Sequence, residues 1–213
     1  EGQPLKAGVI GCGGRGTGAA INFLSAGSGL SVAAAADMFQ DKMDGFRQKL
    51  KDEKNVTLDD AQCHIGFDAY KKVIESDVDI VILATPPFFR PEHFQACVEA
   101  RKHVFMEKPV AVDPVGARSV LVSSKMAASR DLCMVSGTVR RVQKDYMTTQ
   151  MKVANGEIGE IVGAHIIRNG GALWYVKREP QWSDMEYMLR NWNNYCWLCG
   201  DHILDTHVHN IDI

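Results

Sequence analysis

A buried strand, a glycine-rich turn and a helix-forming segment follow one another at the start of the chain. Residues 6–10 are typical of a buried strand, the next six residues read Gly-Cys-Gly-Gly-Arg-Gly, and residues 17–26 favour a helix. The spacing G-x-G-x-x-G has a physical reason in this context. Gly11 permits a tight turn, Gly13 lets a pyrophosphate approach the backbone, and Gly16 allows the helix to pack closely on the strand.

The free amides at the start of this helix would face the phosphates, and the helix dipole favours their negative charge. Glycine-rich turns also occur for purely structural reasons, so the motif alone leaves a nucleotide site and a structural turn equally open.

An acidic residue follows the second predicted strand. Residues 30–36 (LSVAAAA) are apolar and lead into Asp37, about 20 residues past the last motif glycine. A carboxylate here accepts hydrogen bonds from both hydroxyls of a ribose and repels a 2′-phosphate, which favours NAD over NADP. The alternative is a helix N-cap, because residues 40–53 also favour a helix.

Strands and helices alternate up to about Gly137. Further strands are predicted over residues 79–85, 103–106 and 132–136, and further helices over residues 68–76, from Pro91 onwards, and from Asp113-Pro114 to about Ser129. Strand candidates that alternate with helices in this way predict an α/β fold, a Rossmann-type doubly wound parallel sheet. Asp68 and Asp113 are expected to cap their helices.

The pattern changes after Thr138, where we place a domain boundary. A helix is predicted over residues 145–155 and a longer strand over residues 160–168. Residues 170–194 are rich in Trp, Tyr, Asn and Arg, which are more typical of surfaces and pockets than of a core. The predicted domains are therefore residues 1–138 and 139–213.

Composition excludes several classes of protein. The net charge is −2, so no basic surface suggests a nucleic-acid partner. The longest apolar run, residues 78–89, contains an aspartate and two prolines and is too short to span a membrane. The chain opens Glu-Gly-Gln-Pro without a signal peptide, but a processed chain would look the same, so the compartment stays open.

The six cysteines do not suggest a disulfide framework. Four of them, Cys12, Cys63, Cys97 and Cys133, occur singly within apolar or motif segments. We expect these four to be buried or half-buried thiols.

The order of motifs resembles the Gfo/Idh/MocA family of nicotinamide-dependent sugar and polyol dehydrogenases. GCGGRG is followed by Asp37, then by ATPP with His93 eight residues past its threonine, and then by KHVFMEKP. The tail is similar to the family's G-G-x-x-x-D-x-G-x-H-x-x-D helix, although two of its glycines are replaced here. Gly200, Asp205, His209 and Asp212 match that helix, whereas Asp201 and His207 stand where the family has glycine.

The resemblance implies a Rossmann domain followed by an α+β substrate domain. The chain stops where the family normally begins its large open sheet, so we expect the second domain to be incomplete. The family usually pairs through that sheet, which implies a homo-oligomer for the full-length protein. Similarity to exported bacterial relatives implies a periplasmic or exported protein, the alternative being a cytoplasmic one.

The resemblance also assigns roles to residues. Cofactor contacts are implied for Gly11, Gly13, Gly14, Arg15, Gly16, Asp37, Thr85, Pro86, His93, Glu107 and Lys108. The catalytic roles fall on Lys108, Asp205 and His209.

These three residues also suit the chemistry. Oxidising a secondary alcohol needs a base for the hydroxyl proton and a group that stabilises charge on the oxygen. His209 has the right ordinary pKa for the base, and Asp205, four residues earlier, shares its face if the segment is helical. Lys108 could donate a hydrogen bond to the same oxygen. The alternatives are a surface ion pair and an ordinary solvated lysine.

Sugar contacts are expected from Arg140, through charge-assisted hydrogen bonds, and from Trp174 and Tyr175, through a ring platform. These aromatic residues would equally suit a core or an oligomer interface. Related glycosidases carry a Thr-His pair, which Thr206 and His207 resemble, so His207 is a fourth candidate for a sugar contact.

Cys196, Cys199 and His202 have residue types that bind zinc. The second cysteine pair of structural zinc sites is missing, and His209 cannot serve both a metal and a proton, so we predict no metal.

Three functions therefore stay open. The first is an NAD-dependent oxidoreductase acting on a small-molecule sugar, glycoside or cyclic polyol. The second is a glycosidase or lyase that oxidises its substrate transiently with tightly bound NAD. The third is a nucleotide-binding chain without activity. Net reduction of free NAD separates the first two.

Overall fold

The N-terminal part of the molecule is a six-stranded, fully parallel sheet with the order β3-β2-β1-β4-β5-β6. The computed structural model describes residues 3–212. The strands are β1 (Leu5–Ile10), β2 (Leu30–Asp37), β3 (Cys63–Ile65), β4 (Ile80–Leu83), β5 (His103–Met106) and β6 (Met134–Ser136). The direction of the strand order reverses between β1 and β4, where such sheets bind ligands. The predicted α/β Rossmann-type fold is thus confirmed.

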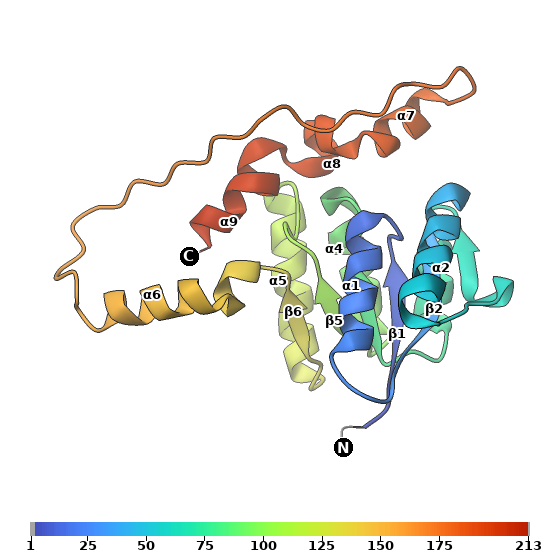
Figure 1. Cartoon of the computed structure of the whole chain (residues 1–213), viewed down its shortest axis with the longest axis horizontal. Coiled ribbons are helices and arrows are strands. Elements are labelled where there is room, and N and C mark those ends of the chain that lie inside the picture. The colour runs from blue at the N-terminus through green and yellow to red at the C-terminus, as the bar shows by residue number, and fades with distance from the viewer. Residues whose placement is uncertain (1–2, 213) are drawn as a thin grey trace.

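Helices cover both faces of this sheet, as Figure 1 shows. They are α1 (Gly14–Ser25), α2 (Gln40–Lys54), α3 (Ala69–Glu75), α4 (Arg90–Glu99) and α5 (Pro114–Ser129), followed after the sheet by α6 (Lys144–Ala154), α7 (Asp184–Arg190), α8 (Cys196–Cys199) and α9 (Val208–Ile211). Short 3₁₀ turns occupy Asp60–Gln62, Pro87–Phe89, Val139–Val142 and Trp192–Asn194, and a π-helical turn spans Ile203–His207.

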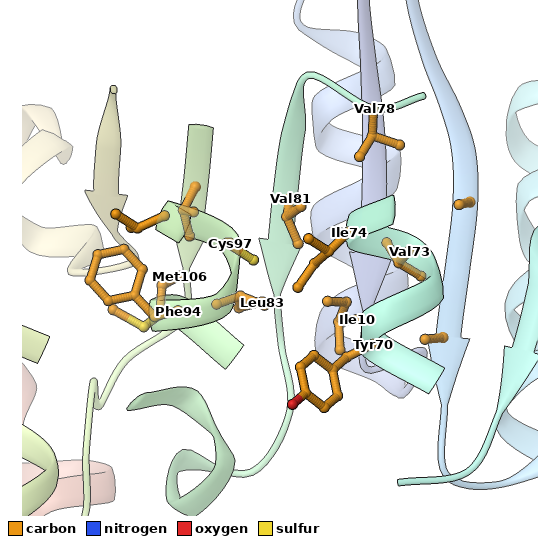
Figure 2. Packing of buried hydrophobic residues seen from close by; sticks show 14 of the residues in the cluster. Ile10, Tyr70, Val73, Ile74, Val78, Val81, Leu83, Phe94, Cys97 and Met106 are labelled. Atoms are coloured by element: carbon orange, nitrogen blue, oxygen red, sulfur yellow. The ribbon is translucent and has the colours of Figure 1, made fainter. Parts of the chain in front are cut away.

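Two apolar cores lie on opposite faces of the sheet. One packs β1, β4 and β5 against α3, α4 and α5, with Val73, Leu83 and Phe94 fully buried (Figure 2). The other packs the sheet against α1 and α2 through side chains such as Phe46 and Leu50. Burying one such side chain contributes about 1.5–3 kcal/mol, so these cores hold the strand ends in place.

The two predicted helix caps differ in the structure. The Asp113 side chain accepts a hydrogen bond from the amide of Gly116 at 2.7 Å, as expected for an N-cap. Asp68 occupies the N-cap position of α3, but its carboxylate pairs with Lys71 at 2.6 Å and not with a helix amide.

The strand predicted over residues 160–168 is wrong. After α6 the chain continues without regular structure and forms an extended arc before it returns at α7 (Figure 1). Val162 is 95% exposed, and no other described strand lies beside this segment. An extended chain without a neighbour has no partner for its amides and carbonyls, so alternation alone does not make a strand.

One expectation about the cysteines needs correction. Cys12 and Cys97 are buried and Cys63 is half-buried, but Cys133 is exposed because it precedes the edge strand β6.

Among the described helices, none combines the length and the apolar character that crossing a membrane requires. This finding does not test the expected exported location, which stays a prediction.

Candidate cofactor and substrate site

The glycine-rich turn is shaped by two glycines that the fold requires and two that leave open space. Gly11 has φ +96°, and a Cβ there would lie 2.7 Å from the amide nitrogen of Thr85. A Cβ on Gly16 would overlap the carbonyl oxygen of Gly11. Around Gly13 and Gly14, in contrast, an added Cβ would meet nothing within 4 Å. The turn thus forms an open cradle that fits a pyrophosphate beside bare backbone.

Asp37 closes one side of this cradle. Its carboxylate accepts hydrogen bonds from the amide of Cys12 at 2.6 Å and from the amide of Phe39 at 2.9 Å. Burial raises the pKa of Asp37, and these two hydrogen bonds oppose that shift. The N-cap of α2 is Phe39 and not Asp37, so the alternative interpretation of Asp37 as the N-cap of that helix is wrong.

A cavity of about 390 Å³ lies at the carboxyl ends of β1, β2 and β4, and we call it the first cavity. Seven of the predicted cofactor residues line it: Gly11, Gly13, Gly14, Asp37, Thr85, Pro86 and His93. His93 is buried, its ring lies 4.2 Å from that of Tyr70, and its Nδ1 is 3.5 Å from the Thr85 hydroxyl. Burial lowers the pKa of His93 to about 4, so its ring is neutral at pH 7.

A second cavity, of about 1390 Å³, lies beside the loop that follows β5. Arg15, Glu107, Lys108 and His209 are among the residues that line it. Glu107 is buried and pairs with Arg15, whose Nε lies 2.8 Å from its carboxylate. Arg15 and Glu107, which were both predicted to contact the cofactor, therefore lie together, but they line the second cavity and not the first.

Two of the three predicted catalytic residues, Lys108 and His209, line this second cavity, and the third, Asp205, contacts Lys108. Lys108 Nζ donates a hydrogen bond to the carbonyl oxygen of Asp205 and lies 3.4 Å from its carboxylate, although the two residues are 97 positions apart. His209 lines the same cavity, and its buried Nδ1 has no hydrogen-bond partner among the described residues. Burial lowers the pKa of His209, and the positive charges of Lys108 and Arg140 lower it further, so its ring is neutral at pH 7.

Comparison with known proteins assigns the fold to a family. A family model described as "Oxidoreductase family, NAD-binding Rossmann fold" matches residues 5–136. The chain belongs to the Gfo/Idh/MocA family.

Inositol dehydrogenases are among the similar members of the Gfo/Idh/MocA family. The myo-inositol 2-dehydrogenase of Thermotoga maritima is 25% identical over 98% of this chain and 53% of its own length. The crystal structure of myo-inositol 2-dehydrogenase from Lactobacillus plantarum is 26% identical over 75% of this chain and 44% of that one, with a TM-score of 0.61.

A third similar protein was crystallised with ligands. The scyllo-inositol dehydrogenase of Lactobacillus casei, with bound NAD(H) and scyllo-inositol, has a TM-score of 0.60 and is 24% identical over 74% of this chain and 43% of that one. At this identity the likeness concerns the fold. The chain spans about half the length of the curated relatives it matches.

Three of the four predicted sugar-binding residues of this Gfo/Idh/MocA protein lie outside both cavities. Arg140 donates hydrogen bonds to the carbonyl oxygen of His209, at 2.9 Å, and to the Asn210 side chain, so it holds α9. Tyr175 is 64% exposed, and His207 packs against another histidine. Trp174 lines the first cavity, on the cofactor side.

The zinc alternative has no support in the geometry. No cluster of three or more suitable side chains occurs between residues 3 and 212. Cys199 is buried and accepts a hydrogen bond from the amide of Asp201 at 3.2 Å. Nε2 of His202 lies 3.2 Å from the carbonyl oxygen of Arg168.

The sequence did not reveal several residues of this Gfo/Idh/MocA site. Arg90 is buried, and its guanidinium donates to the carbonyl oxygens of Thr85 at 2.9 Å, Glu107 at 2.9 Å and Pro109 at 2.6 Å. It therefore ties the ends of β4 and β5 together, and burial lowers its pKa to about 10. Other such residues at the first cavity are Phe39, Lys42, Phe67, Leu189, Arg190 and Trp192.

Proposed function

We propose that this protein is an NAD-dependent oxidoreductase that acts on a secondary alcohol of a sugar, glycoside or cyclic polyol. The observation that carries the proposal is that Lys108 and His209 line one cavity and that Asp205, from the same late segment as His209, contacts Lys108. The inositol dehydrogenases among the relatives support the same class of substrate.

NAD would be held at the first cavity by Gly11, Gly13 and Asp37. The open space at Gly13 suits the pyrophosphate, and the Asp37 carboxylate suits a ribose diol while it disfavours a 2′-phosphate. When bound, NAD supplies a ring carbon that accepts hydride from the alcohol carbon.

The protein's own residues would handle the proton and the charge on oxygen. His209, neutral at pH 7 because its pKa is lowered, accepts the hydroxyl proton. The Lys108 ammonium donates a hydrogen bond to the substrate oxygen and stabilises it as its charge grows. Asp205 holds that ammonium in place through its carbonyl oxygen and its carboxylate.

We also propose a domain boundary near Thr138. The last strand of the parallel sheet ends at Ser136, and α6 and the extended arc follow. Residues 1–138 would bind NAD, and residues 139–213 would begin the α+β substrate domain. Asp205 and His209 come from the second part, so the catalytic set would form only where the two parts meet.

The test is NADH formation, followed at 340 nm, with a panel of polyols and sugars that includes myo-inositol and scyllo-inositol. Because Lys108 lines the second cavity and not the first, Lys108→Met should lower kcat/KM by about 100-fold or more while NADH affinity changes little. Lys125→Met, at an exposed position on α5, is the matched control and should behave like the wild type.

Full activity in the Lys108→Met variant would overturn the assigned role of this lysine. If no net NADH forms but glycosides are cleaved while NAD stays bound, the transient-oxidation alternative replaces plain dehydrogenation. NAD binding without turnover of any alcohol or glycoside would support the third function, a nucleotide-binding chain.

A further inference from the structure

The first cavity has one wall that does not come from the Rossmann sheet. Trp174, Val176, Leu189, Arg190 and Trp192 line it together with the glycine turn and the end of β2. These five residues, which we call the outer wall, follow the end of the last strand of the sheet by 38 to 56 residues in sequence. Figure 1 shows α7 returning to lie above the helices that cover the sheet. A segment beyond the predicted domain boundary thus closes one side of the nucleotide site.

Arg190 fixes the outer wall to the Rossmann part. Its two terminal nitrogens lie 3.0 and 3.1 Å from the two carboxylate oxygens of Asp41, in the first turn of α2. Its guanidinium also lies 3.9 Å from the centre of the Phe39 ring. Only 14% of the Arg190 side chain is exposed, so solvent screens this pair less than an ordinary surface pair.

The two residues after Arg190 hold the rest of the outer wall. Asn191 is buried. Its side chain accepts a hydrogen bond from the amide of Val176 at 2.7 Å and donates one to the carbonyl oxygen of Val176 at 3.1 Å. The ring of Trp192 packs edge-on against that of Trp174, with centres 6.1 Å apart. These contacts join the residues of the wall to one another, and Arg190 connects the wall to α2.

The outer wall faces the part of the cavity that lies beside β2 and β3. Asp37, Phe39 and Phe67 line that part, and Asp37 is the residue that suits the ribose nearest the adenine. Apolar side chains on both sides, such as Phe67 and Leu189, suit the faces of a planar base.

We propose that the outer wall covers the adenosine half of NAD and that the Arg190–Asp41 pair acts as a latch that slows release of the cofactor. This inference rests on the proposed binding of NAD at the first cavity. A cofactor enclosed on this side leaves only after the wall moves away from α2, and the latch opposes that movement. Weakening the latch therefore raises the rate of release more than it changes the rate of binding.

The experiment measures NADH release by stopped-flow fluorescence, with excess NAD⁺ as the displacing ligand. Arg190→Met and Asp41→Asn each break the latch and should raise the release rate about tenfold. Asp60→Asn is the matched control, because Asp60 also pairs with an arginine, Arg47, but does not line the cavity. Its release rate should equal that of the wild type, and Arg190→Lys should lie between.

Each outcome decides a different point. Unchanged release in Asp41→Asn, or equally fast release in Asp60→Asn, overturns the latch. Asp41 is about half exposed, so this variant keeps the test valid even if Arg190→Met fails to fold. A wild-type chain that binds no NADH would refute the proposed function itself, and this result is distinct from a failure of the latch.

Discussion

Gly13 and Gly16 belong to one motif, yet the structure predicts opposite consequences for their replacement by alanine. A Cβ on Gly16 would lie against the backbone oxygen of Gly11, far inside the 3.0 Å limit that real Cβ atoms respect. Because a backbone atom of the central turn cannot swing away, the overpacking cost lies near the upper end of the usual range, about 3 kcal/mol. Because Gly16 lies within α1, the higher helix propensity of alanine offsets about 1 kcal/mol of this cost.

The Gly16→Ala variant should therefore lose about 2 kcal/mol of unfolding free energy, equivalent to a fall in Tm of roughly 4–8 °C for a chain of this size. At Gly13 φ is −67°, which alanine adopts freely, and no atom lies within 4 Å of the added Cβ. Gly13→Ala should change the unfolding free energy by no more than about 1 kcal/mol, the cost of a poorer N-cap. Its Cβ would occupy the space proposed for the pyrophosphate, so NADH affinity should fall about tenfold or more.

Thermal unfolding followed by circular dichroism, together with NADH titration of each variant, separates the two effects. The reasoning is refuted if Gly16→Ala melts like the wild type, because the close approach of α1 to the turn would then not exist in solution. Undiminished NADH binding by Gly13→Ala would show that the open cradle is not where the pyrophosphate binds.

Three further predictions concern acidity, thiols and capping. The pKa of His93 lies near 4 in the folded protein and near 6.5 in the unfolded chain. Between these pH values the unfolded state binds a proton that the folded state does not, so the free energy of unfolding falls by about 3 kcal/mol as pH is lowered from 6.5 to 4. His93→Phe should reduce this loss, measured by urea unfolding at both pH values, and an unchanged loss would contradict the assignment. A thiol reagent should modify exposed Cys133 and Cys196 first and leave buried Cys97 intact, as peptide mass spectrometry would reveal; early labelling of Cys97 would contradict its burial. Asp113→Ala should cost about 1 kcal/mol in thermal or urea unfolding, and no loss would mean that the cap to Gly116 is not made.

The sequence predicted five of the six strands of the Rossmann part, because their signals are local, but not the three-residue edge strand β3. Apolar runs, the glycine spacing and the acid after β2 each depend on a few neighbouring residues, and the sheet unites them. The pairing of Lys108 with Asp205 was expected only through the family resemblance, since no local pattern links residues 97 positions apart.

Other features could not be predicted, because they depend on tertiary contacts. The role of Arg190 arises from packing against Asp41 and Phe39, and nothing in the sequence around Arg190 indicates that partner. Residues 160–168 show the reverse case. Their partial alternation of apolar and polar residues suits a strand, but no strand of the described chain lies beside them to accept their hydrogen bonds, so no sheet forms there.

The central claim, that the glycine cradle and Asp37 bind NAD, is tested most directly by equilibrium titration with NADH and NADPH. The wild-type chain should bind one NADH and should bind NADPH at least about tenfold more weakly, because the Asp37 carboxylate repels a 2′-phosphate. In Asp37→Arg this preference should be lost or reversed. If neither nucleotide binds the wild-type chain, or if NADPH binds as tightly as NADH, the account of this site is contradicted.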